Sequence, residues 1–321
     1  MGSTHFKRID RLSSWRRLAL HLWRRPKDPT VYGNLDIDMS EAVRYLEVVN
    51  REFPDTPVTV THLVVKAIAK ALATWPQSNS IVSRGRLYMR DSVDVYCQVA
   101  TDAGNDLSGV KIPNADRKST VEIAAELNAR VQRVHARKDA GSERTKRTLA
   151  VIPEILLTPM LRVIEFLTYD LRLDLSRFGI AYDQFGGAMV SNVGVFGIGH
   201  GLAPLVPASR TPIVLLVGEI KEQAVVSKGK IVIAPRMQIG STFDHRVIDG
   251  FQAGSLARIV IGSLEDPFKE MPLPNRSSSA DGHGSPMTGD TNDNGPSGRR
   301  YKDPPTESAA EQDRTTREAG G

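Results

Sequence analysis

Cysteine is nearly absent from the sequence, because Cys97 is the single one among 321 residues. A lone cysteine excludes an intrachain disulfide framework and favours a reducing, cytoplasmic setting. Cys97 lies in the strand-like run VDVYCQVA, so we expect a small buried apolar side chain there. Further histidine or cysteine ligands are also lacking near Asp244, His245 and Asp249, so we expect no metal site.

Long uninterrupted apolar runs are missing as well. The first 15 residues have no apolar core followed by small residues, so they do not read as a secretory signal peptide. The most apolar neighbourhood, LAVIPEILLTPMLRVIEFL, does not read as a transmembrane helix. It is interrupted by Pro153, Glu154, Pro159, Arg162 and Glu165. We therefore expect a cytoplasmic protein.

The two ends of the chain differ from its middle. The net charge of +5 arises largely from residues 1–29, where RLSSWRRLALHLWRR has apolar side chains at helical spacing between arginines. We expect this basic amphipathic arm to cap its own domain, and peripheral membrane contact is the less favoured alternative. No nucleic-acid reader motif accompanies the basic residues, so no nucleic-acid partner is expected. Residues 271–321 offer almost no apolar side chains and are predicted to be a disordered polar tail.

Between these ends, helical and strand-like patterns alternate over residues 30–270. Helices are predicted for MSEAVRYLEVVNREF after a capping Ser40, for a segment starting near Thr61, and for KSTVEIAAELNARVQRV with a capping box at Ser119 and Glu122. Strands joined through Arg84-Gly85 and a hairpin turn at Lys228-Gly229 are also predicted. The pattern indicates an α+β fold, an α/β sandwich in which helices flank a mixed sheet and a last helix, 250–262, returns across it.

The segment QIGSTFDHRVIDGFQAGSLARIV concentrates the chemistry. His245 follows an alternating strand, and Asp249 and Gly250 open an apolar helix. A neutral histidine can act as a general base toward a thiol or hydroxyl, and an aspartate at this place can cap the helix or bind an arginine.

DHRVIDG resembles the His-x-x-x-Asp-Gly motif of the dihydrolipoamide acyltransferases of 2-oxo acid dehydrogenase complexes, which have a chloramphenicol acetyltransferase-like fold. Further blocks resemble the same catalytic domain in its order, including SVDVYCQVAT, IPNADRKSTVEIAAEL, GGAMVSNVGVFGI and KIVIAPRMQIGSTFDHRVIDG. The resemblance covers about residues 30–267. An insertion at about 141–182 and Gly109-Val110, where the family usually has Pro-Val, depart from the family pattern.

The resemblance implies a role for each matching residue. His245 would deprotonate the acceptor thiol, and Ser191 would stabilise the tetrahedral oxyanion. Asp249 would maintain the site by pairing with an arginine, for which Arg17 is the candidate. Asn192 shapes the turn beside Ser191, and Gly250 completes the motif.

The resemblance also implies partners. Coenzyme A or acyl-CoA would be a co-substrate, and the chain would form a homotrimer or larger homo-oligomer in which His245 of one copy faces Ser191 of the next. A family member with its own lipoyl domain would need more residues before Thr30, so we expect a stand-alone catalytic domain without a lipoyl attachment site. An acyl-carrying protein is then a further candidate partner.

Two other functions stay open. A catalytically inactive or repurposed member of the same fold is the main alternative, because of the departures from the family pattern. A serine hydrolase built from Ser191, His245 and Asp249 is a minor one, since the Gly-x-Ser-x-Gly elbow is missing. The apolar stretch of the insertion could line the acyl pocket, pack on the domain, bind a neighbour or touch a membrane.

Overall fold

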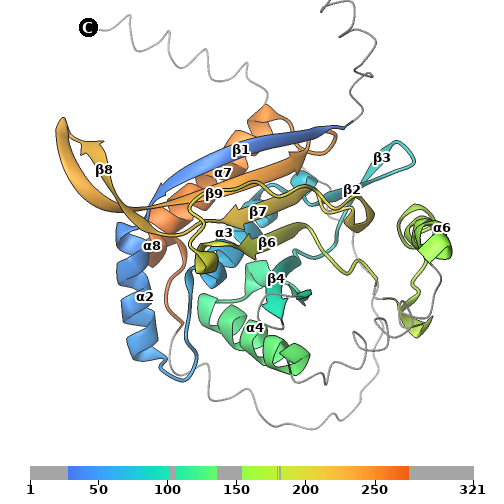
Figure 1. The fold of residues 1–321 in the computed structure, drawn as a ribbon, viewed down its shortest axis with the longest axis horizontal. Helices are drawn as coiled ribbons and strands as arrows, with labels where there is room; N and C mark the ends of the chain where they lie inside the picture. The colour runs from blue at the N-terminus through green and yellow to red at the C-terminus, as the bar shows by residue number, and fades with distance from the viewer. Residues whose placement is uncertain (1–27, 102–105, 136–153, 179, 181, 275–321) are drawn as a thin grey trace, which may run out of the picture. The chain divides into compact units, whose positions relative to one another are not determined.

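The computed structural model describes residues 28–101, 106–135, 154–178, 180 and 182–274. Within them, a seven-stranded sheet has the order β1-β9-β7-β6-β4-β5, with β8 paired to β9 (Figure 1). β6 runs parallel to β4 and β7, and all other neighbours are antiparallel. The strands are β1 (Thr30–Asp38), β4 (Val95–Thr101), β5 (Asp106–Ile112), β6 (Ala188–Asn192), β7 (Ile213–Val217), β8 (Lys221–Ser227) and β9 (Lys230–Asp244). A separate hairpin consists of β2 (Ser80–Ser83) and β3 (Arg86–Met89).

Helices cover one face of this mixed sheet, which confirms the predicted fold class. They are α2 (Ser40–Glu52), α3 (Val60–Thr74), α4 (Thr120–His135) and α7 (Gly250–Glu265), followed by the short α8 (Pro267–Glu270). α6 (Glu154–Glu165) continues into a π-helical turn, Phe166–Asp170. Single 3-10 turns occur at Pro76–Ser78, Ala115–Arg117, Ser176–Phe178, Gly194–Phe196 and Pro207–Ser209.

The helix starts follow local side-chain chemistry. The predicted capping box of α4 is confirmed, since Ser119 N donates to Glu122 Oε2 over 2.7 Å and Glu122 N donates to Ser119 Oγ over 3.2 Å. The predicted cap at Ser40 is wrong. Ser40 is already the first residue of α2, and its N–H donates to the carboxylate of Asp38 over 2.9 Å. An ionised oxygen two residues earlier satisfies this N–H, so the serine is not needed as the cap.

Both predicted hairpin turns are confirmed. Arg84 and Gly85 have φ of 47° and 73°, and Lys228 and Gly229 have φ of 51° and 76°. Two successive left-handed residues match the twist of the flanking strands, which is why a glycine occurs in each pair. β1 was not predicted, although Leu35 and Ile37 alternate with polar residues along it.

Two glycines, one in β9 and one directly after β7, allow a loop to cross the sheet on the face away from the helices. A Cβ at Gly240 of β9 would lie 1.9 Å from the carbonyl oxygen of Gly201, and one at Gly218 would lie 2.2 Å from that of Gly199. No side chain fits at such distances, because the obstacle is backbone. The loop therefore leads across the sheet from the end of β6 to the start of β7.

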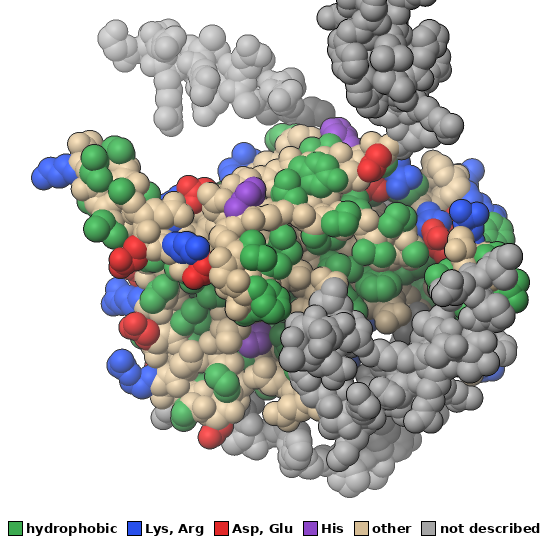
Figure 2. All heavy atoms as spheres, viewed as in Figure 1, with side chains coloured by type: hydrophobic (Ala, Val, Ile, Leu, Met, Phe, Trp, Pro, Cys, Tyr) green, Lys and Arg blue, Asp and Glu red, His purple; other side chains and the backbone are tan. Residues whose placement is uncertain are grey.

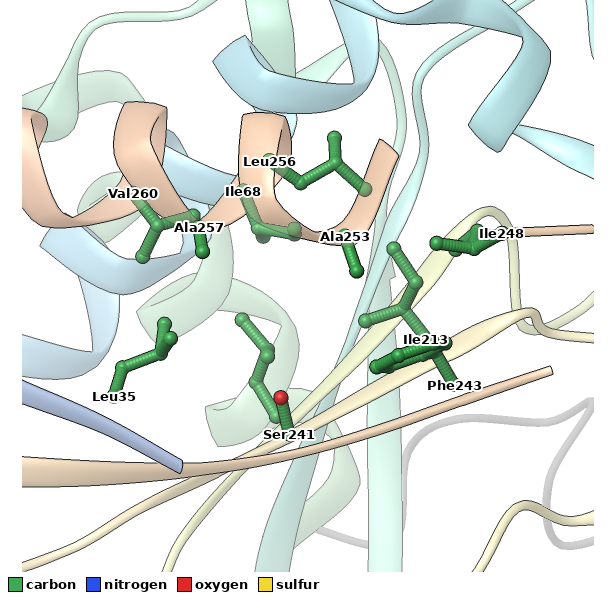
Figure 3. Close-up of a pocket in the computed structure, with 11 residues that line it drawn as sticks. Leu35, Ile68, Ile213, Ser241, Phe243, Ile248, Ala253, Leu256, Ala257 and Val260 are labelled. Carbon is green, nitrogen blue, oxygen red and sulfur yellow. The ribbon is translucent and has the colours of Figure 1, made fainter. Parts of the chain in front are cut away.

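The core lies between the sheet and the helices, and its described residues enclose a small apolar cavity. This cavity of about 40 Å³ lies between β1, β7 and β9 on one side and α3 and α7 on the other (Figure 3). Aliphatic side chains of Leu35, Ile68, Ile213, Leu256 and Val260 point into it, and Ser241 supplies a lone hydroxyl. Apart from the Ser241 hydroxyl its lining is apolar, and we treat this small void as part of the core.

Candidate functional site

His245 is held on a tight turn at the end of β9. The N–H of His245 donates to Pro29 O over 2.9 Å, and the N–H groups of Val247 and Ile248 both donate to Asp244 O. The Asp244 carboxylate in turn accepts from Arg246 Nη2 over 2.6 Å, and this bond raises the pKa of the arginine. These contacts tie down the backbone on both sides of His245, while its side chain is exposed. Its imidazole makes no hydrogen bond to another described residue, so the ring is available to a substrate.

Asp249 is the N-cap of α7. Its Oδ1 accepts from Gln252 N over 2.8 Å, and its own N–H donates to Gln252 Oε1 over 3.0 Å. This reciprocal capping box uses the carboxylate that was also considered for an arginine. The candidate arginine, Arg17, lies outside the described residues. Gly250 is the first residue of α7, and nothing lies within 4 Å of the place where a Cβ would be.

Ser191 lies near the end of β6, between Gln98 of β4 and Leu216 of β7. Ala188 and Val190 of the same strand belong to the helix-covered core, so Ser191 points to the opposite face. Among the described residues, no partner bonds its hydroxyl. Asn192 faces the helices, where its Nδ2 donates to Thr61 Oγ1 over 2.9 Å, and its Oδ1 accepts from Gly194 N over 2.9 Å. Asn192 thus joins α3 to the turn that follows β6.

A single copy of the chain does not bring His245 and Ser191 together. In the register of the sheet, Ser191 pairs with Leu216 of β7, and Leu216 pairs with Gly240 of β9. His245 lies five residues beyond Gly240, which corresponds to roughly 16 Å along the strand, and two strand spacings add roughly 10 Å across the sheet. β9 is antiparallel to β7, so the two residues lie toward opposite ends of the sheet.

The separation of Ser191 from His245 within one copy argues against the serine-hydrolase alternative. A Ser-His-Asp triad needs hydrogen bonds from serine to histidine and from histidine to aspartate. Within one chain Ser191 is far from His245, and Asp249 bonds the start of α7. No such triad is assembled in the described part of one copy.

A cavity of about 420 Å³ lies beside the His245 turn. Its walls come from the start of β1, from Pro204–Pro207, from the residues before β7 and from the His245 turn itself. Asp28, Tyr32, Arg210, Asp244 and Arg246 line it. Sequence reasoning missed Arg210, which no motif identifies. Its guanidinium also holds the inserted segment, with Arg210 Nε 2.7 Å from Glu165 Oε1 and Nη2 3.1 Å from Asp170 Oδ2.

Other candidate groups do not form a site in the described part of the chain. Cys97 is 1% exposed, as predicted, and burial raises the pKa of its thiol to about 12, so it is unsuited to nucleophilic chemistry. The described residues contain no cluster of three or more histidine, cysteine, aspartate or glutamate side chains that could hold a metal ion. They also contain no helix of the length and apolarity needed to cross a membrane.

The chain belongs to the family of the 2-oxoacid dehydrogenases acyltransferase catalytic domain. The sequence model of this family matches residues 11–152 and 181–271, which confirms the resemblance found in the sequence. Residues 153–180, which contain α6 and the π-helical turn, lie outside the match. The family therefore accounts for the sheet, the covering helices and the His245 turn, but not for this inserted segment.

Two curated relatives are the dihydrolipoyllysine-residue acetyltransferase component of the pyruvate dehydrogenase complex of Rickettsia prowazekii and the succinyltransferase component of the mitochondrial 2-oxoglutarate dehydrogenase complex of Saccharomyces cerevisiae. The first is 26% identical over 74% of this chain and 49% of the relative. The second is 26% identical over 83% of this chain and 50% of the relative. The chain thus spans about half the length of the curated relatives it matches.

Solved structures agree on the fold. A probable dihydrolipoamide acetyltransferase from Listeria monocytogenes has a TM-score of 0.57 and 19% identity, covering 85% of this chain and 99% of that one. The dihydrolipoamide acetyltransferase of Azotobacter vinelandii has a TM-score of 0.57 and 20% identity, covering 76% and 84%. That structure concerns the roles of a serine, a histidine and an asparagine in catalysis, with the asparagine four positions after the histidine.

Proposed function

We propose that this chain is an acyltransferase that moves an acyl group between coenzyme A and a thiol acceptor, with an active site formed by two copies of the chain. The observation that carries the proposal is the position of His245. Its side chain is exposed on a turn that backbone hydrogen bonds hold in place, beside a cavity of about 420 Å³. The imidazole forms no hydrogen bond or ion pair with another described residue. The proposal includes a reducing, cytoplasmic setting, which the single buried cysteine supports.

The proposed reaction uses two side chains. His245 takes the proton of the acceptor thiol, and the thiolate attacks the carbonyl carbon of acyl-CoA. A tetrahedral oxyanion forms, to which the Ser191 hydroxyl donates a hydrogen bond. Its collapse breaks the carbon–sulfur bond to CoA, and the departing CoA thiolate takes the proton from the imidazolium of His245. The acyl group is then on the acceptor, and the histidine is neutral again.

The relatives support the choice of substrates. Their names describe acetyl or succinyl transfer at a dihydrolipoyllysine residue, which carries thiols. We infer a dihydrolipoyl group, or a thiol like it, as the acceptor. The serine, histidine and asparagine of the Azotobacter vinelandii structure support Ser191, His245 and the position of Asp249 as parts of the site.

Two copies are part of the proposal, because His245 and Ser191 lie toward opposite ends of one sheet. A second copy, placed by symmetry, can bring its Ser191 to the first copy's His245.

The β8–β9 arm, the two-stranded ribbon of residues 221–236, offers a surface for this contact. Figure 1 shows it projecting from the sheet, and Figure 2 shows hydrophobic side chains on it. Val226, Ile231 and Ile233 are 77%, 78% and 73% exposed. The solved core of a pyruvate dehydrogenase complex, with a TM-score of 0.57, supports a homo-oligomer, with a trimer as the expected unit.

The test is co-expression of two inactive variants, His245→Ala and Ser191→Ala, carrying different affinity tags. Each variant alone is expected to lose turnover, measured as CoA thiol release from acetyl-CoA with dihydrolipoamide as acceptor; His245→Ala should lose about 10²–10⁴-fold. In randomly mixed oligomers, about one site in four combines an intact His245 with an intact Ser191 from the neighbouring copy. A trimer that carries both tags contains one such site among its three, so doubly tagged trimers should regain about a third of the wild-type rate.

Two outcomes would contradict the proposal. Mixed oligomers without any recovered turnover would place both residues in one chain or remove one from the mechanism. Wild-type protein whose thiol release equals that of His245→Ala, across acetyl, succinyl and longer acyl-CoA donors, would favour the inactive or repurposed member of the fold. The doubly purified wild-type protein is the matched control for assembly.

A further inference from the structure

In the described part of the inserted segment, residues 154–178 and 180, two carboxylates bind the rest of the chain. Glu165 and Asp170 both bind Arg210, and Asp170 Oδ1 accepts from Ser83 Oγ over 3.0 Å. Arg210 Nη1 also donates to Val82 O over 2.7 Å, which ties the same guanidinium to β2. Tyr169 is 7% exposed beside these groups, and burial raises the pKa of its hydroxyl. The acidic side of the segment is therefore turned toward the body.

The opposite side of α6 is apolar and exposed. Leu156, Pro159, Val163 and Phe166 follow each other at intervals of three and four residues, which puts them on one stripe of the helix. Leu156, Val163 and Phe166 are 55%, 56% and 47% exposed, and Pro159 is exposed as well. A surface helix of a soluble domain normally has its apolar stripe on the core side. Here an apolar stripe faces away from the residues that Glu165 binds.

The β2–β3 hairpin contacts the inserted segment and has exposed apolar side chains of its own. Leu87 and Met89 are 52% and 58% exposed. Arg84 lies over the ring of Phe166 at 5.4 Å, and Arg172 lies over the ring of Tyr88 at 4.5 Å. These contacts hold the hairpin against the inserted segment. We call the exposed apolar stripe of α6 and the start of the following turn the α6 face; its apolar members are Leu156, Pro159, Val163 and Phe166.

The acidic and basic side chains of this region differ in their partners. Glu165 and Asp170 are paired with Arg210, and Asp174 accepts from Ser176 N over 2.9 Å. By contrast, Arg86 and Arg162 form no ion pair with a described residue, and both are exposed. Arg177 is exposed as well and interacts electrostatically with Asp174. Figure 2 shows hydrophobic and basic side chains next to each other at the edge where Figure 1 places α6. The outward surface therefore combines aliphatic side chains with guanidinium groups.

We propose that the α6 face binds peripherally to a membrane surface rich in anionic lipids. An interfacial helix inserts its apolar side chains at the boundary between headgroups and acyl chains, while arginines attract anionic headgroups. The α6 face has both parts, and the carboxylates of Glu165 and Asp170 are paired with Arg210 rather than directed at an anionic surface. The family match omits this segment, and the proposal is independent of the acyltransferase activity.

The test is co-sedimentation of the full chain with vesicles of phosphatidylcholine alone and of phosphatidylcholine with 30% phosphatidylglycerol, at about 0.1 M salt. Wild-type protein is expected to bind the anionic vesicles at least tenfold more tightly than the neutral ones. Arg162→Gln with Arg86→Gln should weaken this binding roughly tenfold or more. Val163→Glu with Phe166→Glu should abolish it. Arg44→Gln with Arg51→Gln, on the exposed side of α2, is the matched charge control and should bind like wild type.

Three outcomes would overturn the proposal. One is absence of binding to anionic vesicles. A second is equal binding by wild type and the Val163→Glu, Phe166→Glu variant, which would assign the affinity to the basic residues 1–29. The third is a wild-type oligomer that dissociates in this variant while no protein sediments with vesicles, which would make the α6 face an interface between copies. All substituted side chains are exposed, and circular dichroism checks that each variant is folded.

Discussion

The role proposed for Ser191 depends on chemistry rather than on packing. Its hydroxyl has no partner among the described residues, so Ser191→Ala should leave the thermal unfolding temperature unchanged. Loss of an oxyanion donor should lower kcat by about 10²–10³-fold. The KM for acyl-CoA should change much less, because the bond forms only in the transition state. Steady-state kinetics with acetyl-CoA provide the measurement, and a variant with more than half of the wild-type kcat would remove Ser191 from the mechanism.

Two substitutions of Asp249 distinguish a role as helix cap from a role as partner of an arginine. As the N-cap of α7 it accepts from Gln252 N, a bond that asparagine can also accept. Asp249→Asn should therefore keep the stability of the wild type and most of its turnover, whereas Asp249→Ala should lose about 1 kcal/mol of unfolding free energy. Urea denaturation and thiol release measure the two effects. A stable Asp249→Asn variant without activity would favour the arginine pairing that the family resemblance implies.

Single residues were predictable where one local interaction decides their role. Asp249 follows a strand and precedes an apolar helix, so its capping role is visible in the sequence. Ser40 was misassigned because serine at a helix start is a common cap, whereas here the Asp38 carboxylate is close enough to take its N–H. Arg210 could not be found, because its partners Glu165 and Asp170 are about 40 residues away in the chain and no spacing rule links them.

At the scale of elements, the loop between β6 and β7 depends on backbone contact at Gly240. A methyl group there would lie 1.9 Å from Gly201 O, so Gly240→Ala must displace the loop or the strand. We expect a loss of about 1–3 kcal/mol, typical of overpacking. Gly262→Ala, in α7 where nothing lies within 4 Å, is the matched control and should stabilise the protein by about 0.5–1 kcal/mol. Urea denaturation measures both; equal stabilities of the two variants would contradict the close crossing.

α3 contains a pH-sensitive cap. His62 is 3% exposed, accepts from Thr59 N over 2.9 Å, and has its pKa lowered by burial to about 4 from 6.5. Between these pH values the unfolded chain binds a proton that the folded one excludes, so the unfolding free energy falls as pH decreases from 6.5 to 4. The unfolding free energy should decrease by about 3 kcal/mol over this pH range. His62→Gln keeps a capping-box acceptor without a titrating group and should lose less stability over this range. Parallel slopes of the two proteins in urea titrations against pH would contradict this.

Elements with a local signal were predicted, and those that depend on distant partners were not. α2, α3, α4 and α7 have apolar periodicity, and both hairpin turns have a residue pair that adopts positive φ. β1 was missed because one edge strand with glycine and several polar residues has a weak alternation signal. The crossing at Gly240 was also invisible, since it depends on a loop that the sequence does not place over the sheet.

The order and direction of strands determine the site at the scale of the molecule. Sequence blocks identified His245 and Ser191, but only the pairing of β6, β7 and β9 shows that one copy keeps them toward opposite ends of the sheet. Hydrophobic alternation specifies which side of a strand is buried and leaves strand order open. The family resemblance implied a site shared between copies before the geometry was known, and the geometry provides an independent reason to expect one.

In the proposed oligomer, the β8–β9 arm would link this site to assembly. Val226 is level with Ile231, and Ala224 is level with Ile233, so these exposed side chains share one face of a two-stranded ribbon. A ribbon with such a face is poorly stable alone in water and gains from burial against another copy. We expect Ile231→Glu with Ile233→Glu to yield monomers with an unchanged circular dichroism spectrum. Turnover should fall at least 100-fold, although His245 and Ser191 are intact, because the shared site requires both copies.

Analytical ultracentrifugation and thiol-release assays on the same samples measure both effects of the arm variant. Ser227→Glu, at the tip of the same arm and outside its apolar face, is the control for added charge and should remain oligomeric and active. A monomeric variant with wild-type turnover would mean that one chain suffices for the reaction. An oligomeric and active variant would move the contact between copies away from the arm, because two buried glutamates could not be accommodated in an apolar interface without a large loss of affinity.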